Sequence, residues 1–199
     1  KINEYDTLSS EERWNEYYDV ILANPPFFSP KGGITPHNRF GIKSSKAEVL
    51  FIDYINEHLK PNGRAGIIVP DGINYQPNKS YASLRKIFLK NLVGIVSLPT
   101  GVFQPYSTVK TSVLILDKKI SNDLKNIFYL EIRNDGYTLS SSRKKSTKND
   151  ISDAIDLIQS FLKNNGKLSV NKSDLNFLII DKEKIKSNNY LLNINNYTI

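Results

Sequence analysis

One stretch decides how this chain folds, namely Asp19-Val20-Ile21-Leu22-Ala23-Asn24-Pro25-Pro26-Phe27-Phe28. Its apolar run, residues 20–23, predicts a short buried strand. The strand has to end at Asn24, because two consecutive prolines supply no N–H group and cannot continue a β-ladder. The residue before a proline is held extended as well, so Asn24 and Pro25 are both stiff.

The residues that follow this strand have the character of a ligand site. They offer an amide, two carbonyls fixed by prolines, and two phenylalanine rings. Because α/β proteins bind ligands at the carboxyl ends of parallel strands, this combination suits a planar, hydrogen-bonding substrate such as a nucleobase. The alternative interpretation is a strand that ends in a Pro-Pro turn, with Phe27 and Phe28 in the core.

The composition narrows the class of protein. The 199 residues are 39% hydrophobic and 24% charged, which is an ordinary globular balance. With no cysteine there is no disulfide and no thiolate metal site, and His37 and His58 are too few for a zinc enzyme or a Ser-His-Asp hydrolase. We therefore predict no metal site. The net charge of +7 fits a polyanionic partner.

Two further features concern the setting of the chain. No run approaches the roughly 18 apolar residues of a membrane helix, so we predict a cytoplasmic protein without a membrane partner. The chain begins at Lys1 and contains no methionine, from which we expect a piece of a longer protein.

Strands and helices alternate along the first half of the chain. This order predicts right-handed βαβ units in a parallel sheet, and prolines at three strand ends place three loops along one carboxyl edge. Two later strands have no helix between them and are expected to be antiparallel edge strands. The predicted segments are strands at 20–23, 65–70 and 92–98, helices at 46–60 and 80–91, and the two later strands at 111–116 and 127–132.

The loops and the tail complete the predicted organisation. Residues 29–45 are rich in glycine, proline and serine, which predicts an exposed and mobile functional loop. Residues 136–149 are polar and are expected to be a solvated loop before a helix that Asp150 caps, at 150–164. A strand at 175–180 is expected in the lysine-rich tail. The chain thus divides into 1–135, the main α/β region, and 136–199, a basic loop, helix and tail.

Several ordered motifs carry a resemblance to a known family. Over about residues 5–160 the chain closely resembles N6-adenine DNA methyltransferases, and the best match is the modification subunit of type I restriction-modification systems. The motifs are residues 19–28, Leu59-Lys60-Pro61-Asn62-Gly63-Arg64, Ile67-Ile68-Val69-Pro70-Asp71-Gly72, 96–103 and Val109-Lys110-Thr111-Ser112-Val113-Leu114.

The resemblance implies a fold, a cofactor and a reaction. The fold is a Rossmann-like S-adenosylmethionine-dependent methyltransferase fold with a small helical extension, and the substrate is an adenine flipped out of DNA. The Asn24 side-chain oxygen and the Pro25 carbonyl, stiffened by Pro26, would accept the two N6 hydrogens, while Phe27 would stack on the base. Asn24 would also lie beside the cofactor.

The resemblance also implies contacts with the cofactor and with DNA. Asp6 lies where the family carries a residue that accepts from the cofactor's adenine, although a turn before Thr7 is an alternative interpretation. Tyr106 is expected to wall the base pocket, and Phe103 is either a second wall or core. The cations expected to meet DNA phosphates are Lys31, Arg39, Lys43 and Lys110.

The chain departs from the family pattern at the cofactor. The glycine-rich cofactor loop normally precedes the Asn-Pro-Pro-Phe strand, and only 23 residues precede Asn24 here. We therefore expect the main cofactor residues upstream of this chain, and no activity from the chain by itself. The family implies a specificity subunit, a restriction subunit and a prokaryotic cytoplasm. Two alternatives remain: methylation of rRNA guanine N2 or of protein glutamine, and a non-catalytic DNA-binding or assembly module.

Overall fold

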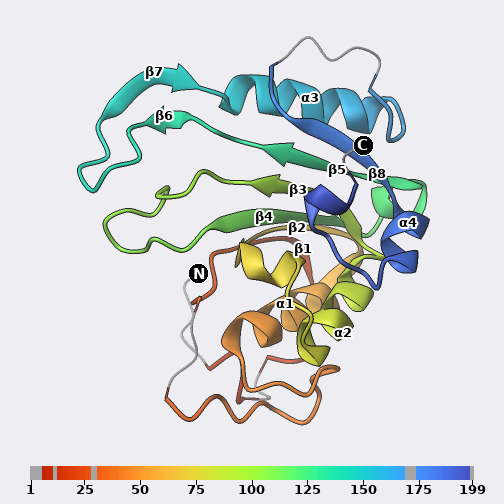
Figure 1. Ribbon diagram of the computed structural model, residues 1–199. Helices are drawn as coiled ribbons and strands as arrows, with labels where there is room; N and C mark the ends of the chain where they lie inside the picture. The colour runs from red at the N-terminus through yellow and green to blue at the C-terminus, as the bar shows by residue number, and fades with distance from the viewer. Residues whose placement is uncertain (1–5, 11–12, 28–30, 169–173, 198–199) are drawn as a thin grey trace.

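The computed structural model describes residues 6–10, 13–27, 31–168 and 174–197. It contains a six-stranded sheet with helices on both faces, and a separate two-stranded hairpin (Figure 1). The strands of the sheet, in spatial order, are β1 (Tyr18–Ala23), β2 (Leu59–Pro70), β4 (Thr111–Asp117), β3 (Leu92–Ser97), β5 (Asn126–Glu131) and β8 (Phe177–Asp181).

Four strands share one direction. β1 pairs parallel with β2 and β3 pairs parallel with β5, while β4 is antiparallel to both β2 and β3. Pro25 and Pro26 after β1, Pro70 at the end of β2 and Pro99 after β3 therefore lie along one edge of the sheet. This confirms the prediction that three proline-marked strand ends share one carboxyl edge.

The two later strands are not edge strands, contrary to the sequence prediction. β4 turns back from β3 and inserts between β2 and β3, where Leu114 lies opposite Ile67 on one side and Ile95 on the other. β4 is antiparallel as predicted, whereas β5 is parallel to β3 and is covered on its outer side by β8. The apolar side chains of β4 and β5 favour these central places, because only there are both faces buried.

The strand at the start of the chain is less buried than its apolar sequence predicts. β1 is an edge strand with β2 as its sole neighbour in the sheet among the described residues. Ile21 and Ala23 pack against the core, whereas Val20 is 49% and Leu22 83% exposed. The apolar run therefore has one buried face only, because no described element covers its other side.

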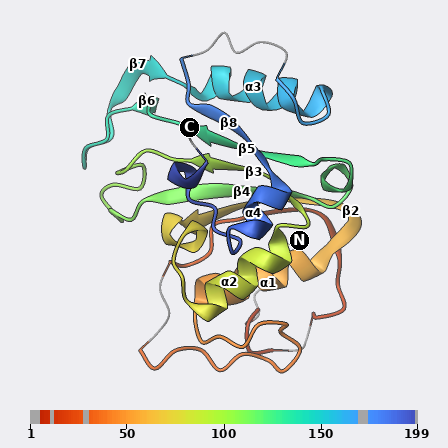
Figure 2. The same ribbon diagram turned by 45° about the vertical axis from the view of Figure 1, so that its right-hand side comes forward.

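Helices α1 (Ala47–His58) and α2 (Lys79–Phe88) cover one face of the sheet together with α4 (Lys182–Ser187), and α3 (Ile151–Lys163) covers the other. Figure 2 shows α1 and α2 on the opposite side of the strands from α3. The predicted helix at 46–60 ends at His58, and β2 begins at once. Residues 60–63 form a bulge within β2, because Tyr18 pairs with Leu59 and Val20 with Arg64.

The region after residue 135 is more ordered than predicted. Residues 136–149 form most of a hairpin of β6 (Asp135–Tyr137) and β7 (Lys145–Asn149), not a solvated loop. Asp150 stands at the N-cap position of α3, as predicted, but its side chain accepts from no N–H group of the helix; its Oδ2 accepts instead from the Arg133 and Asn134 N–H groups at 2.8 Å each. The tail adds β8 to the main sheet. The boundary between 1–135 and 136–199 stays a prediction, since the sheet continues across it.

Candidate active site

The Asn-Pro-Pro-Phe residues stand at the carboxyl edge, directly after β1. Ala23 pairs with Ile67, which lies three residues before Pro70 at the end of β2. The residues that follow Ala23 therefore lie beside the last residues of β2. Pro25 is buried and Phe27 half-buried, whereas Asn24 and Pro26 are exposed. The buried proline holds the turn against the protein and leaves the Asn24 amide accessible to a ligand. Phe28 lies outside the described residues.

Phe27 and Phe103 form an aromatic pair at this edge of the sheet. The rings of Phe27 and Phe103 meet at 74°, with their centroids 5.8 Å apart. Edge-to-face pairs of this kind are a preferred aromatic geometry. Phe103 lies on the loop between β3 and β4, residues 98–110, which projects from the sheet on the same side as the β6–β7 hairpin (Figure 1).

Tyr106 differs from Phe103 in its surroundings. The sequence favoured Tyr106 as the wall of a base pocket, and its side chain is 94% exposed. The structure therefore brings Phe103, and not Tyr106, next to Phe27. The spacing of aromatic residues in a short loop does not reveal which ring turns inward.

The base of this loop is held by Lys110. Its ammonium donates to the Leu98 carbonyl oxygen, and the Lys110 carbonyl accepts from the Asp71 N–H at 2.9 Å. The Leu98 N–H donates to the Thr111 carbonyl at 3.0 Å, which closes the loop from the other strand. Lys110, predicted to meet a DNA phosphate, thus turns its charge toward the protein.

Asp6 is part of a local turn. Its Oδ1 accepts from the N–H groups of Leu8 at 3.0 Å and Ser9 at 3.1 Å, and its Oδ2 accepts from the Ser9 hydroxyl at 2.7 Å. These bonds, the Ser9 hydroxyl foremost, lower the pKa of the Asp6 carboxyl below its ordinary value. The geometry fits the turn interpretation, and the cofactor role of Asp6 stays a prediction.

The loop before α1, which carries the predicted DNA-binding residues Lys31, Arg39 and Lys43, is attached to that helix. Lys31 and Lys43 are exposed, while Arg39 donates to Asn15 Oδ1 at 3.0 Å and lies over the Trp14 ring. The loop is anchored by Asp53 of α1, whose Oδ2 accepts from the Ile42 N–H at 3.0 Å. No sequence pattern singles out this residue. Burial raises the pKa of the Asp53 carboxyl.

The β6–β7 hairpin adds cations to the same edge. Arg143 pairs with Asp135 at 2.5 Å and lies over the Tyr137 ring, so its charge is used within the hairpin. Lys144, Lys145 and Lys148 are exposed. Gly101 of the Phe103 loop lies close to the Leu139 carbonyl, which shows that the two projections are neighbours.

The described residues hold no group of three or more His, Asp or Glu side chains arranged to bind a metal ion. Within the same part of the chain, no helix is long and apolar enough to span a membrane.

Comparison with known proteins identifies the family to which the chain belongs. The model of the N-6 DNA methylase family matches residues 1–199. The chain belongs to the N-6 DNA methylase family. Among curated N-6 DNA methylase relatives, the type I restriction enzyme EcoEI methylase subunit of Escherichia coli is 33% identical over 121 residues, 59% of this chain and 24% of that protein. The EcoKI methylase subunit of Escherichia coli K12 is 35% identical over 115 residues, 57% of this chain and 21% of that protein.

Solved structures agree with this assignment. A chain from a type I restriction-modification system studied for complex assembly and conformational transition superposes with a TM-score of 0.73 at 29% identity, covering 89% of this chain and 37% of that one. The type I methyltransferase subunit of Streptococcus thermophilus shares the fold at a TM-score of 0.71 and 21% identity, covering 95% and 40%. The expected α/β, Rossmann-like methyltransferase fold is confirmed. The N-6 DNA methylase segment described here spans less than half of each of these proteins.

Proposed function

We propose that this chain is the acceptor-base part of a type I modification subunit, which transfers a methyl group to adenine N6 in DNA. One observation carries the proposal: Asn24-Pro25-Pro26-Phe27 stands at the carboxyl edge with Phe27 paired edge-to-face with Phe103. Membership of the N-6 DNA methylase family supports the same reaction. The proposal extends to the whole protein, because the matched segments are only 24% and 21% of the length of the two curated relatives.

The residues of this edge suit a flipped adenine. The Asn24 side-chain oxygen and the Pro25 carbonyl oxygen are acceptors that the two prolines hold in place, so they accept the two N6 hydrogens. This draws N6 toward tetrahedral geometry and frees its lone pair. An amide oxygen accepts without bringing a charge beside a sulfonium, so no general base is needed before transfer.

Two rings recognise the flat faces and edge of the base. An adenine that stacks on Phe27 meets Phe103 from the side, because the two rings are close to perpendicular. Stacking on an aromatic side chain contributes roughly 1–3 kcal/mol per base, which offsets part of the cost of flipping.

The cofactor proposed for the parent protein is S-adenosylmethionine, which supplies an electrophilic methyl group when bound. The described residues fit only the side of the cofactor that faces the acceptor base. Asp6, the other predicted cofactor residue, already accepts three hydrogen bonds within its own turn. We therefore assign Asn24 to the contact between base and cofactor. The main cofactor residues are proposed in the part of the relatives' length that this chain does not span.

Cations around the edge are proposed to meet the phosphates of DNA. Lys144, Lys145 and Lys148 of the hairpin join Lys31, Lys43 and Arg39 in this role, whereas Lys110 supports the Phe103 loop. Each phosphate contact releases counterions, so binding should weaken steeply with salt. Assembly with a specificity subunit, and with a restriction subunit, is proposed from the kind of relatives, with the lysine-rich tail from Lys167 as the docking segment. The proposed setting is the prokaryotic cytoplasm, where such DNA lies.

The test is methyl transfer by the full-length protein assembled with its specificity subunit. Transfer of tritiated methyl groups from S-adenosylmethionine to adenine N6 should be lost in Asn24→Ala and strongly reduced in Pro25→Ala. Methyl transfer that persists in Asn24→Ala would contradict the proposed mechanism. Mass analysis of nucleosides from treated DNA and RNA distinguishes adenine N6 from guanine N2 as the acceptor, and mass analysis of treated protein would detect a methylated glutamine; the relatives favour neither alternative. Calorimetry that finds no cofactor binding would favour a non-catalytic assembly module.

A further inference from the structure

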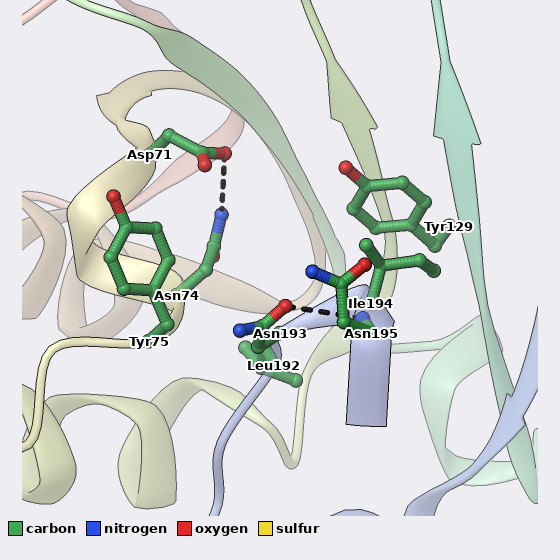
Figure 3. Close-up of a pocket in the computed structure, with 8 residues that line it drawn as sticks. All are labelled: Asp71, Asn74, Tyr75, Tyr129, Leu192, Asn193, Ile194 and Asn195. Carbon is green, nitrogen blue, oxygen red and sulfur yellow. Dashed lines mark hydrogen bonds between the residues drawn. The ribbon is translucent and has the colours of Figure 1, made fainter. Parts of the chain in front are cut away.

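Two cavities, neither of them lined by the Asn-Pro-Pro-Phe residues, differ in charge. The smaller has a volume of about 300 Å³ and lies between η1 (Asp71–Asn74) and η3 (Ile194–Asn196); among the described residues that line it, only Asp71 is charged (Figure 3). The larger, called the lysine cavity below, has a volume of about 760 Å³, well within the range of small-molecule sites. Its lining includes five lysines, namely Lys86, Lys90, Lys125, Lys182 and Lys186.

The lysine cavity lies at the edge of the sheet opposite to Asn24. It is found where β3 and β5 begin and where β4 and β8 end, since β4 runs antiparallel to β3 and β8 to β5. Three segments far apart in sequence line it: the end of α2, the turn from η2 (Ile120–Asn122) into β5, and the junction of β8 with α4. β3 spans six residues, so this edge is about 20 Å from the carboxyl edge. A ligand in this cavity is therefore separate from a base held at Phe27.

The two acidic residues that line the lysine cavity are already engaged. Asp181 Oδ1 accepts from the Glu183 and Lys184 N–H groups, at 2.6 Å and 3.3 Å, and so caps α4. The Glu183 carboxylate pairs with the Lys186 ammonium at 2.6 Å. Neither carboxylate therefore neutralises the other lysines of the cavity.

Three of the lysines have no acidic partner. In the described part of the chain, no acidic side chain lies within ion-pair distance of Lys86, Lys90 or Lys125, and all three are exposed. Lys86 lies in the last turn of α2 and Lys90 two residues beyond its end, so both charges stand at one end of the helix. Like charges gathered in this way repel one another and destabilise the folded chain. A bound anion would remove that repulsion.

Lys182 is the least exposed lysine of the cavity. Its ammonium donates to the Ser121 carbonyl oxygen at 2.9 Å. Burial, followed by the neighbouring charge of Lys186, lowers the pKa of the Lys182 ammonium. The buried side chains of Leu89 and Leu124 add an apolar part to the lining. The cavity thus combines exposed ammonium groups at its rim with a half-buried one and with apolar surface.

Phosphate groups match these lysines in charge and in hydrogen bonding. An ammonium group only donates hydrogen bonds, and the oxygens of an ionised phosphate are strong acceptors. A chain of phosphates concentrates several negative charges in a small volume, as lysines that converge from three segments require. The carboxylates of an acidic peptide are instead spread along an extended chain. The lining therefore favours a compact ligand with several phosphate groups.

We propose that the lysine cavity binds a small molecule that carries a chain of two or three phosphate groups. The flexible side chains of Lys86, Lys90 and Lys125 reach the phosphates from the rim, because each carries its charge on a four-carbon stem. The ligand is either an inorganic polyphosphate or a nucleoside polyphosphate, which share this chemistry. The proposal does not depend on methyl transfer at the carboxyl edge.

Isothermal titration calorimetry of the full-length protein with inorganic tripolyphosphate, in a buffer of physiological ionic strength, tests the proposal. The double variant Lys90→Gln, Lys125→Gln should weaken binding about tenfold. The matched control is Lys79→Gln, Lys163→Gln, which removes the same charge from exposed lysines outside the cavity. The control should change the affinity less than about twofold, because only non-specific attraction depends on net charge alone.

Further ligands identify the source of the phosphate chain. Equal affinities for tripolyphosphate and ATP would show that the phosphates alone are recognised, and tighter binding of ATP would identify a nucleoside polyphosphate. Orthophosphate should bind much more weakly than tripolyphosphate, because it reaches fewer of the lysines. Asn24→Ala should bind tripolyphosphate as the wild-type protein does.

Several results would overturn the proposal. These are no binding of tripolyphosphate or ATP, equal binding of orthophosphate and tripolyphosphate, equal weakening in the two double variants, and loss of binding in Asn24→Ala. Polyglutamate or a single-stranded oligonucleotide that binds through Lys90 and Lys125 more tightly than tripolyphosphate would likewise replace the small molecule by a macromolecular partner.

Discussion

The ring of Phe103 meets the ring of Phe27 at 74° across 5.8 Å, although the two residues come from different loops. Replacement of Phe103 by alanine should therefore lower kcat/KM for DNA about tenfold in the full-length enzyme, since one aromatic contact with a base contributes roughly 1–3 kcal/mol. Tyr106→Ala is the matched control, because that ring is exposed. An equal loss in both variants would contradict the assignment.

Lys110 should act through the loop and not through DNA. Lys110→Met removes the ammonium that donates to the Leu98 carbonyl, so we expect methyl transfer to fall several-fold while the salt dependence of DNA binding keeps its slope. Lys144→Ala on the exposed hairpin is the comparison, and it should lower that slope by about one with a small loss of activity. Filter binding over a salt series measures both. If Lys110→Met lowers the slope of the salt dependence, Lys110 contacts a DNA phosphate after all.

Gly94 lies where β3 passes close to an aromatic side chain of β5. A Cβ atom at this position would lie 2.3 Å from the Phe128 ring, so Gly94→Ala must displace a fully buried side chain. We expect a loss of about 1–3 kcal/mol in the free energy of unfolding, measured by urea denaturation. Gly41→Ala, whose added atom would meet ordinary contacts at 3.6 Å, should change stability little. Similar losses in both would contradict the Phe128 contact as the cause, since the lower entropy of the unfolded chain after Gly→Ala acts in the stabilising direction.

Local chemistry explains which parts of the fold the sequence predicts. Prolines and glycines end β1, β2 and β3, and the amphipathic pattern of α1 is visible in the sequence, so the strand ends along one edge are predictable. The place of β4 is not, because its apolar run suits an edge or a centre equally well. Only pairing with Ile67 and Ile95, far away in sequence, decides it.

The candidate site shows the same division. The Asn-Pro-Pro-Phe turn is a local feature and was predicted, whereas contact between Phe27 and Phe103 depends on where the 98–110 loop folds. The β6–β7 hairpin escaped prediction because its residues are polar on both faces, and period-two patterning needs one buried face. Asp53 gave no signal either, since an acidic residue in a helix is ordinary until its burial is known.

Asp53 should give the loop before α1 a characteristic pH dependence. Its carboxylate accepts from the Ile42 N–H, so Asp53→Ala should destabilise the protein by about 1–3 kcal/mol. Burial raises the pKa of the folded carboxyl above its ordinary value of 3.8, so the folded state binds this proton more tightly than the unfolded state. The contribution of Asp53 to stability is therefore greatest below that ordinary value and declines as the pH rises through the folded pKa. Urea denaturation of the wild-type protein and of Asp53→Ala should be compared between pH 3.5 and 8. The loss in free energy of unfolding caused by Asp53→Ala should become smaller toward neutral pH. A loss that grows with pH would instead mean that the ionised form is the one the folded state favours.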